Sequence, residues 1–206
     1  MISVVIQAGG ESRRMGQDKG LVELAGRPLV QHVLDRVGQL GDEVWITTNR
    51  PQAYAFLGTP TASDPQPGLG ALVGLRTALR AARGDTVLVV ACDLPFLQPA
   101  LLQHLLSLAG EADVVIPRRD GKFEPLHAVY RRSCLTALEA ALARGDSRMI
   151  SFFPDVRLLP VDESDLALYD PEGLSFFNVN TPDDLIRAER QLQAASSQPT
   201  EDQHDA

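Results

Sequence analysis

The sequence predicts an α/β protein, a three-layer α/β/α sandwich built around a mostly parallel sheet. Strand-like and helix-like patterns alternate along the chain, which is typical of strands joined by right-handed helical crossovers. Residues 86–91 form an apolar run with no polar alternation, as expected for a central strand covered on both faces. The chain also opens with an apolar strand, residues 2–8, which runs directly into paired glycines. We expect one domain spanning residues 1–193.

The other elements follow from periodicity and from breaker residues. Pro28 opens a helix in which Val30, Val33 and Val37 keep helical spacing. Further strands are expected at 43–48, 112–117, 126–130 and 176–179, and further helices at 70–82, 99–109, 131–144 and 182–192. Residues 194–206 are polar and lack periodicity, which predicts a disordered tail.

Composition limits the class of protein. The net charge of −8 argues against a nucleic-acid binder, because phosphate contacts require a basic face. No apolar run approaches the ~20 residues that a membrane helix needs. The two cysteines, Cys92 and Cys134, lie far apart and outside any zinc-ligand spacing. We therefore expect a cytoplasmic protein that acts on small molecules, with neither nucleic acid nor membrane as a partner.

Several polar or glycine residues follow predicted strands. They are Gly9, Gly10, Asn49, Asp93 and Asn180, in the loops after residues 8, 48, 91 and 178. Ligands of such sheets bind outside the carboxyl ends of the strands, near the point where strand order reverses. One crevice could therefore gather all five residues.

The first loop predicts a phosphate site. Gly9 and Gly10 would allow close approach of the backbone, and Arg13, Arg14 and Lys19 supply positive charge. The loop matches neither the Walker A sequence nor the dinucleotide-binding glycine fingerprint. The alternative is an ordinary strand-to-helix turn with exposed basic residues, but three cations so close to the glycines favour phosphate binding.

Asp93 follows the most apolar strand of the chain, in the segment Cys-Asp-Leu-Pro. A carboxylate buried there needs a partner, and Mg²⁺ prefers one or two carboxylates together with substrate phosphates. Alternatively, Asp93 caps the turn that Pro95 helps to form. Beside a triphosphate loop, the metal interpretation is the stronger of the two.

A second nucleotide-binding segment is suggested by Asp64 and the glycines that follow it. Glycines at a helix start would let a base or ribose approach the backbone around Gly70 and Leu72. Asp64 could accept a hydrogen bond from a base N–H or a sugar hydroxyl. A flexible loop followed by an ordinary amphipathic helix explains the spacing equally well.

The segment Asn178-Val179-Asn180-Thr181-Pro182 suggests a site for a polar small molecule. Two asparagines at i and i+2 of a strand point to the same side. Thr181 before a proline-initiated helix is also a good N-cap, so a structural role competes there. The histidines form no cluster; His127 could face the crevice, but a structural role is the better interpretation.

These motifs together resemble the molybdenum cofactor guanylyltransferases, a branch of the nucleotidyltransferase superfamily, over residues 2 to about 192. The resemblance implies a Rossmann-like nucleotidyltransferase fold. It rests on Gln-Ala-Gly-Gly and Ser-Arg-Arg-Met-Gly-Gln-Asp-Lys, Thr-Asn-Arg at 48–50, Asp64, Gly70 to Gly74, Cys-Asp-Leu-Pro, and Asn-Val-Asn-Thr-Pro.

The resemblance also implies roles for individual residues. The residues implied to contact GTP are Gln7, Ala8, Gly9, Lys19 at the phosphates, and Asp64. Asp93 would hold Mg²⁺, and Asn178 and Asn180 would lie on the molybdopterin side. Gln7 stands where many relatives have Leu, and Ala71 replaces a proline that is often seen between Gly70 and Leu72. Thr47 falls where some relatives have Asn, so contact with the base could rest on Thr47 or Asn49.

The implied reaction is attack of the terminal phosphate of molybdopterin on the α-phosphorus of GTP, with release of pyrophosphate. Arg14, Lys19 and Asp93 with its Mg²⁺ would position the phosphates and neutralise their charge. One alternative is a related enzyme that uses CTP on molybdopterin or another triphosphate on a sugar phosphate. Another is a nucleotide-binding regulatory module without catalysis. Transient contacts with other cofactor-biosynthesis proteins or recipient molybdoenzymes are also expected.

Overall fold

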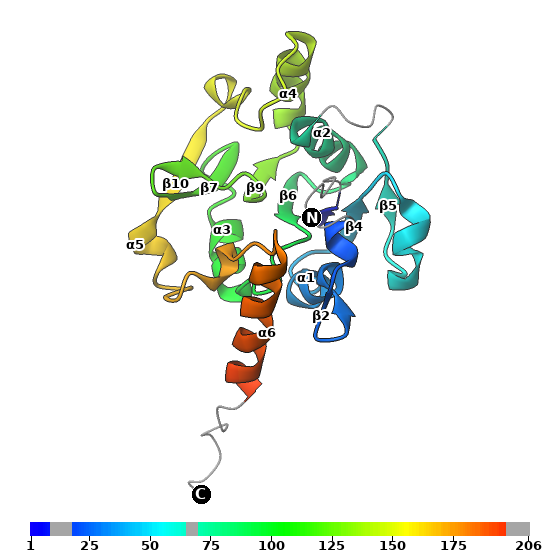
Figure 1. Ribbon diagram of the computed structural model, residues 1–206. Coiled ribbons are helices and arrows are strands. Elements are labelled where there is room, and N and C mark those ends of the chain that lie inside the picture. Colours follow the sequence, from blue (N-terminus) through cyan, green and yellow to red (C-terminus); the bar gives the residue numbers. More distant parts are fainter. Residues whose placement is uncertain (9–17, 65–69, 197–206) are drawn as a thin grey trace, which may run out of the picture.

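The apolar strands of the sequence assemble into one central sheet, seen in the computed structural model of the chain (Figure 1). The structure describes residues 1–8, 18–64 and 70–196. Within these residues the sheet has eight strands, in the order β10-β7-β9-β6-β1-β4-β5, with β8 paired to β7. The strands of this sheet are β1 Ile2–Gln7, β4 Glu43–Thr47, β5 Thr61–Ala62, β6 Thr86–Ala91, β7 Val114–Arg119, β8 Lys122–Phe123, β9 His127–Arg131 and β10 Leu158–Asp162.

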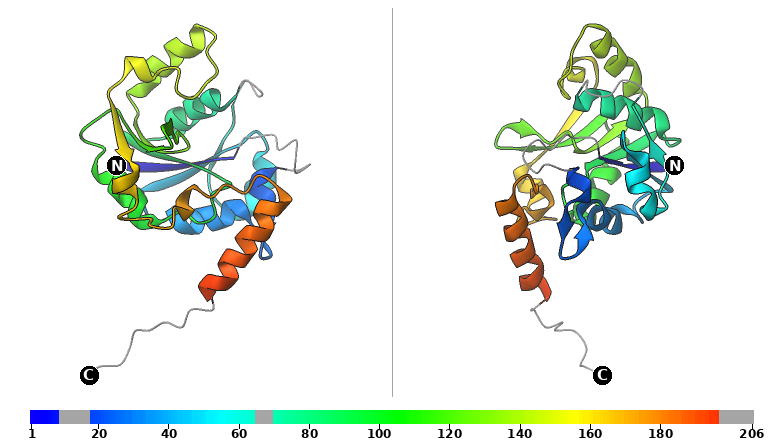
Figure 2. Two further views of the ribbon diagram at one scale, coloured as in Figure 1. Left: turned by 60° about the vertical axis from the view of Figure 1, so that its left-hand side comes forward. Right: turned by 45° about the vertical axis from the view of Figure 1, so that its right-hand side comes forward.

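Helices cover both faces of the sheet, which gives the three predicted layers (Figure 2). The α-helices are α1 Leu29–Val37, α2 Ala71–Ala81, α3 Pro99–Ser107, α4 Cys134–Ala143, α5 Glu163–Leu166 and α6 Pro182–Ser196. Short 3₁₀ turns are η1 Lys19–Leu21, η2 Pro51–Leu57, η3 Phe153–Asp155 and η4 Leu174–Phe176, and β2 Glu23–Leu24 and β3 Arg27–Pro28 form a separate hairpin. In the described part of the chain, no helix combines the length and apolarity needed to cross a bilayer.

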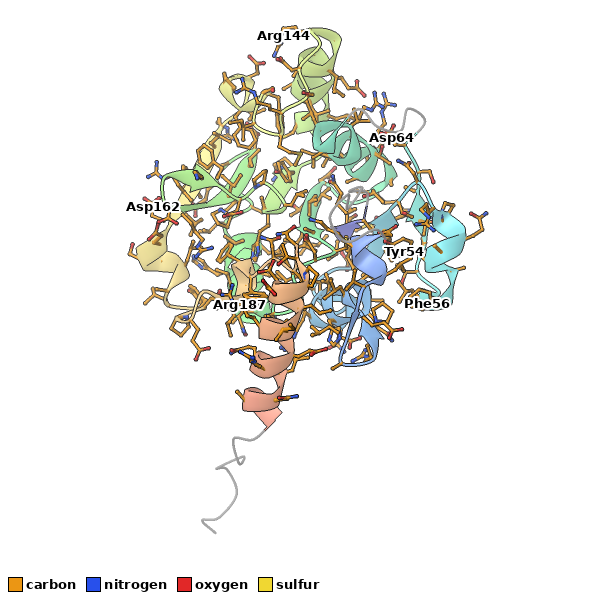
Figure 3. The ribbon with its side chains drawn as sticks, in the orientation of Figure 1. Tyr54, Phe56, Asp64, Arg144, Asp162 and Arg187 are labelled. Atoms are coloured by element: carbon orange, nitrogen blue, oxygen red, sulfur yellow. The ribbon has the colours of Figure 1, made fainter. Side chains whose placement is uncertain are left out.

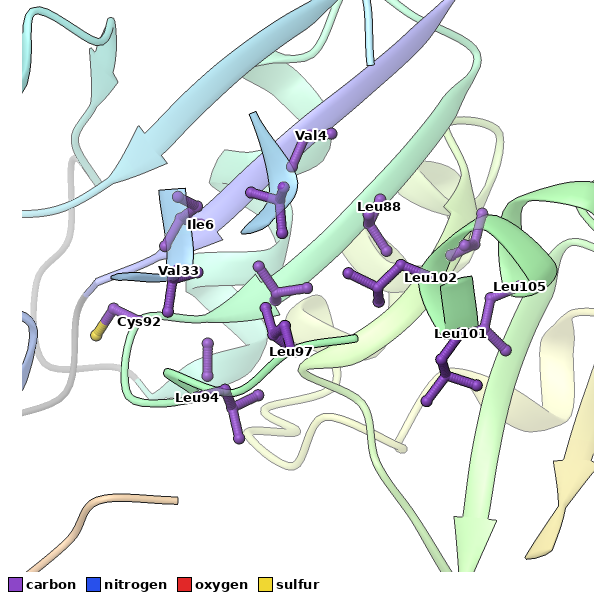
Figure 4. Close-up of a cluster of buried hydrophobic side chains, with 14 of the residues drawn as sticks. Val4, Ile6, Val33, Leu88, Cys92, Leu94, Leu97, Leu101, Leu102 and Leu105 are labelled. Carbon is purple, nitrogen blue, oxygen red and sulfur yellow. The ribbon is translucent and has the colours of Figure 1, made fainter. Parts of the chain in front are cut away.

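Strand residues alternate between two cores, one on each face of the sheet. On β1, Val4 and Ile6 pack toward α1 and α3, whereas Val5 packs toward α2 and α4. Figure 4 shows part of the first core, in which Leu88 of β6 and Leu102 of α3 lie near the β1 side chains. The central residues of both strands are buried on both faces of the sheet, which explains the uninterrupted apolar runs at 4–6 of β1 and 87–91 of β6.

The order of the strands reverses beside β1, as the fold class requires. The chain runs from β1 to β4 and β5 on one side, then crosses to β6 on the other side, and these pairs are parallel. The exception near the switch point is β9, which runs antiparallel to both β6 and β7. Because β9 is reversed, its first residue, His127, lies at the same edge as the carboxyl end of β6.

Most predicted elements are confirmed with ends within a few residues, but three differences stand out. Residues 177–180 form no strand, and η4 precedes them, so the predicted strand at 176–179 is wrong. The edge strand β10 was not predicted, because Pro160 interrupts its pattern, and proline is tolerated at a sheet edge. The last helix, α6, continues to Ser196 beyond its predicted end, and the rest of the predicted tail lies outside the described residues.

Candidate active site

The candidate active site begins where β1 and β6 end side by side. The carbonyl of Gln7 accepts a hydrogen bond from the Cys92 N–H (3.2 Å), and the Ala8 N–H donates to the Thr47 carbonyl (2.8 Å). These bonds fix the ends of three parallel strands at one level. Gly9, Gly10, Arg13 and Arg14, predicted to bind phosphate, lie outside the described residues.

Lys19 stands on η1, whose position is fixed by a buried tyrosine. The Asp18 side chain caps this turn by accepting a bond from the Gly20 N–H (3.2 Å). The Tyr54 hydroxyl donates to the same carboxylate oxygen (2.6 Å) from η2, and its ring is fully buried. Tyr54 is labelled in Figure 3. Burial, with the nearby acidic groups, raises the Tyr54 pKa above its ordinary value, so the hydroxyl stays a donor.

Lys19, Asp93 and Asn180 meet in one cluster at the switch point. The Lys19 ammonium donates to Asp93 Oδ2 (3.2 Å) and to Asn180 Oδ1. Asp93 is 7 % exposed, so its charge needs this partner. These three predicted residues come from separate loops, and the fold brings them together.

The asparagine segment is held against Asp93 by its own backbone. The Val179 N–H donates to the Asp93 carbonyl (3.0 Å), and the fully buried Val179 side chain belongs to a core cluster with residues of β2, α1 and α6. Asn178 and Asn180, on either side of it, both line the adjoining pocket. They therefore share a side of the chain, as predicted, although the segment is a loop and not a strand.

Thr181 caps α6. Its hydroxyl accepts from the Asp184 N–H (3.2 Å), and the Asp184 carboxylate accepts from the backbone N–H groups of Asn180 (3.1 Å) and Thr181 (3.0 Å). These bonds lower the Asp184 pKa, the bond with the Thr181 hydroxyl most of all. The structural role considered for Thr181 is thus the one it has, and the cap fixes Asn180.

The donor set at Asp93 fits Mg²⁺ better than a metal held by the protein alone. Among the described residues there is no group of three or more His, Cys, Asp or Glu side chains arranged to hold a metal ion. Asp93 offers one buried carboxylate at the edge of an open pocket. Mg²⁺ characteristically uses one or two carboxylates and takes its other ligands from phosphates and water.

A second group of predicted residues lies beside the N-terminus of α2. Gly70 is the N-cap with φ of +93°, a conformation that favours glycine. Gln7 Nε2 donates to the Ala71 carbonyl (3.2 Å), and the Gln7 amide fills the space where a side chain at position 74 would lie. A side chain at position 74 would therefore displace the Gln7 amide from this contact. Leu72 buries its side chain in the core, which leaves only its backbone for a ligand.

Asp64 is paired with Arg76 of α2, a residue that the sequence patterns did not single out. Arg76 Nη2 lies 3.4 Å from Asp64 Oδ1, and both side chains are at most 15 % exposed. Asn49 supports Asp64 by accepting its backbone N–H (3.0 Å). Thr47 Oγ1 and Arg76 Nε are buried and have no hydrogen-bond partner among the described residues, so this side holds polar atoms that the described structure leaves unsatisfied.

A pocket of about 310 Å³ adjoins the Lys19 cluster, and it contains residues that the sequence analysis did not assign to a site. Its described lining consists of Lys19, Ala91, Asp93, Leu94, Glu124, Pro125, Leu126, His127, Met149, Phe176, Asn178 and Asn180. Gln7, Thr47, Asn49, Asp64, Gly70 and Leu72 are not part of this lining, so the predicted residues divide into two neighbouring groups.

The turn at 124–127 enters the site because β9 is antiparallel. The sequence analysis searched the loops that follow strands, whereas this turn precedes one. The signal that could have found it is a pair of ionisable residues, Glu124 and His127, flanking Pro125 immediately before an apolar strand. Both cysteines, Cys92 and Cys134, are buried and free.

The fold and the site together define a nucleotidyltransferase. Residues 4–158 match the family described as the MobA-like NTP transferase domain. The chain is similar, with 31% identity and a TM-score of 0.81, to the crystal structure of molybdopterin-guanine dinucleotide biosynthesis protein A from Archaeoglobus fulgidus; the match covers 93% of this chain and 99% of that one.

Two relatives narrow the class further. A probable molybdenum cofactor guanylyltransferase from Pelotomaculum thermopropionicum is 40% identical over 89% of this chain and 90% of its own length. A molybdenum cofactor guanylyltransferase from Desulfosudis oleivorans is 34% identical over 94% of this chain and 96% of its own. The chain belongs to the molybdenum cofactor guanylyltransferase family.

Proposed function

We propose that the chain transfers GMP from GTP to molybdopterin, forming molybdopterin guanine dinucleotide and pyrophosphate. The observation that carries the proposal is the cluster of Lys19, Asp93 and Asn180 at the switch point of the sheet. The names of the relatives support the same reaction. The two groups of polar residues suit two substrates that meet at this cluster, GTP on the α2 side and the acceptor in the pocket.

The reaction needs no nucleophile from the protein. An oxygen of the acceptor phosphate attacks the α-phosphorus of GTP, the bond from that phosphorus to the bridging oxygen breaks, and pyrophosphate leaves with the electron pair. Mg²⁺ at Asp93 would supply charge neutralisation on the phosphates. Lys19 would exchange its contact with Asp93 for phosphate oxygens, and Asn180 would keep its ammonium in position.

Several smaller points remain predictions from the sequence. Arg14 is proposed to assist at the phosphates, and Thr47 and Asn49 remain the candidates for contact with the base. Of these two, Asn49 already uses its amide oxygen on the Asp64 N–H, which favours Thr47. A cytoplasmic location and transient contact with other cofactor-biosynthesis proteins or recipient molybdoenzymes are likewise predictions.

The test is direct. The protein is mixed with Mg²⁺, molybdopterin and each of the four ribonucleoside triphosphates in turn, and the dinucleotide formed is identified by mass spectrometry. We expect a guanine dinucleotide and stoichiometric pyrophosphate with GTP. A cytosine dinucleotide would replace the proposal by its CTP-dependent alternative, and no product with any triphosphate would favour a regulatory module.

A further inference from the structure

Glu124 is an ionisable group in the pocket without a partner in the described part of the chain. Its side chain is half-buried and lines the same cavity as Lys19 and Asn180. It makes no hydrogen bond or ion pair with a described residue; only its backbone is engaged, with its N–H donating to the Pro117 carbonyl (3.0 Å). Burial raises the Glu124 pKa, and the charge of Arg119 partly opposes that effect. A half-buried carboxylate without a hydrogen bond can be satisfied by a ligand that donates one.

His127 is a second unsatisfied group in the same lining. It is 1 % exposed, and neither ring nitrogen makes a hydrogen bond of normal geometry with a described residue, although one faces the Ser175 carbonyl. Burial lowers its pKa to about 3, so the ring is neutral. Its face stacks on Phe176 with 4.5 Å between the ring centroids, and the Arg119 guanidinium lies 4.5 Å from the centroid of the same Phe176 ring. These contacts fix the ring, whose two nitrogens are buried without a hydrogen-bond partner among the described residues.

The two ends of the pocket carry opposite charges, which would favour one orientation of the acceptor. At the switch point the Lys19 ammonium pairs with Asp93. If a metal ion bound Asp93, the ammonium would be free to attract a phosphate. At the turn before β9, the Glu124 carboxylate would repel a phosphate but accept N–H donors. The occupant that suits both ends carries a phosphate at one end and a donor-rich, uncharged heterocycle at the other.

We propose that Glu124, with neutral His127 beside it, determines acceptor specificity by accepting the paired N–H donors of the acceptor's pterin ring. The inference rests on the proposed function, which supplies molybdopterin as the acceptor. A 2-amino-4-oxo pterin presents an amino N–H and an adjacent ring N–H on one edge, and a carboxylate can accept both. The volume of about 310 Å³ lies at the lower end of ligand pockets, as suits one part of a two-substrate site.

The test compares Glu124→Gln and Glu124→Ala with Glu111→Gln, which removes the same charge from an exposed residue between α3 and β7. Steady-state kinetics give KM for molybdopterin and for GTP separately. Loss of a buried, charged hydrogen-bond acceptor predicts a rise of about 10- to 100-fold in KM for molybdopterin in the Glu124 variants. KM for GTP should stay within about twofold of the wild-type value, as expected for a group that does not touch the nucleotide. The Glu111 variant should match the wild type in both.

A second measurement separates this inference from the proposed function. Binding of molybdopterin without GTP is followed by quenching of its pterin fluorescence, and circular dichroism checks that each variant is folded. If the wild type makes no dinucleotide but binds molybdopterin through Glu124, the proposed function fails and the inference stands. If the wild type is active and the folded Glu124 variants keep wild-type affinity and KM for molybdopterin, the inference is overturned.

Discussion

The two ends of the pocket differ in how their polar side chains are satisfied. At the switch point, Lys19, Asp93 and Asn180 bond to one another, and Tyr54 and Asp18 hold the turn that carries Lys19. At the turn before β9, Glu124 and His127 have no side-chain hydrogen bond of normal geometry with a described residue. The first end has its geometry fixed before substrate arrives, which favours catalysis. The second end is completed only by a ligand, which favours recognition.

The largest expected effect is at the switch point, the end whose geometry is fixed before substrate binds; we call it the preset end. Lys19→Ala should lower turnover at saturating GTP and acceptor by a factor on the order of 10²–10³, the usual result of removing one pre-positioned donor that stabilises charge in a transition state. Pyrophosphate release measures the rate, and circular dichroism checks the fold. Near-normal turnover in a folded variant would remove Lys19 from the mechanism and with it the catalytic role of this end.

The mostly buried pair of Arg76 and Asp64, on the side proposed to bind the nucleotide, allows a second test. Arg76→Met should lower the free energy of unfolding by about 1–3 kcal/mol, because Asp64 loses a charged partner in a mostly buried place, and should weaken GTP binding. Urea denaturation and GTP titration measure the two effects. The control is Arg80→Met on the same helix, whose exposed pair with Glu139 is expected to contribute about 0–1 kcal/mol. Equal losses in both variants would contradict a special role for Arg76.

His127 predicts a dependence of stability on pH. Its pKa is about 3 in the folded protein against an ordinary value of 6.5, so below pH 6.5 the unfolded chain binds a proton that the folded one does not. Stability should therefore fall as the pH drops from 6.5 toward 3, by about 1 kcal/mol per pH unit once the unfolded histidine is protonated.

His127→Phe keeps an aromatic ring against Phe176. It should remove the contribution of His127 to the fall of stability with decreasing pH. Urea denaturation between pH 4 and 6 compares the two proteins. Carboxylates with lowered pKa, such as those of Asp113 and Asp184, lose their contribution as the pH falls through their lowered values, but they do so equally in both proteins. Identical slopes would mean that His127 is not held neutral by burial.

The smallest expected effects come from two tyrosines, one anchoring each end. Tyr54 donates to Asp18 beside Lys19, and Tyr130 donates to the Pro125 carbonyl beside Glu124, each at 2.6 Å. Tyr54→Phe and Tyr130→Phe should each cost about 1 kcal/mol of stability. Turnover should fall severalfold only in the first, and KM for the acceptor should rise only in the second. The same kinetic change in both variants would remove the distinction between the two ends.

The sequence predicted the preset end well and the other end poorly, for a physical reason. Asp93 follows β6, whose apolar pattern is clear, and the carboxyl ends of parallel strands meet at one edge of the sheet. Lys19 and Asn180 were found from their own motifs, because Asn180 follows a loop and not the strand predicted before it. Glu124 precedes a strand, and only the reversed direction of β9, which no local pattern encodes, carries it to the same edge.

The loop at 176–180 shows a similar limit. The apolar and asparagine residues there suggest a strand, but Val179 finds its backbone partner in the Asp93 loop and its side-chain partners under α6. Long-range packing thus decided the local conformation. Arg76 was missed because its helix reads as ordinarily amphipathic, and only the fold places it against Asp64.

The reversed direction of β9 has a consequence for how this architecture can diversify. The loops proposed to bind the triphosphate follow parallel strands, and each is tied to the crossover that comes after it. Residues 124–126 lie between β8 and β9, which both run antiparallel to β7, and they bear no such crossover, so they can change without moving a helix. If Glu124 selects the acceptor as proposed, acceptor preference can evolve by substitution in this short segment, while the residues of the switch point stay intact.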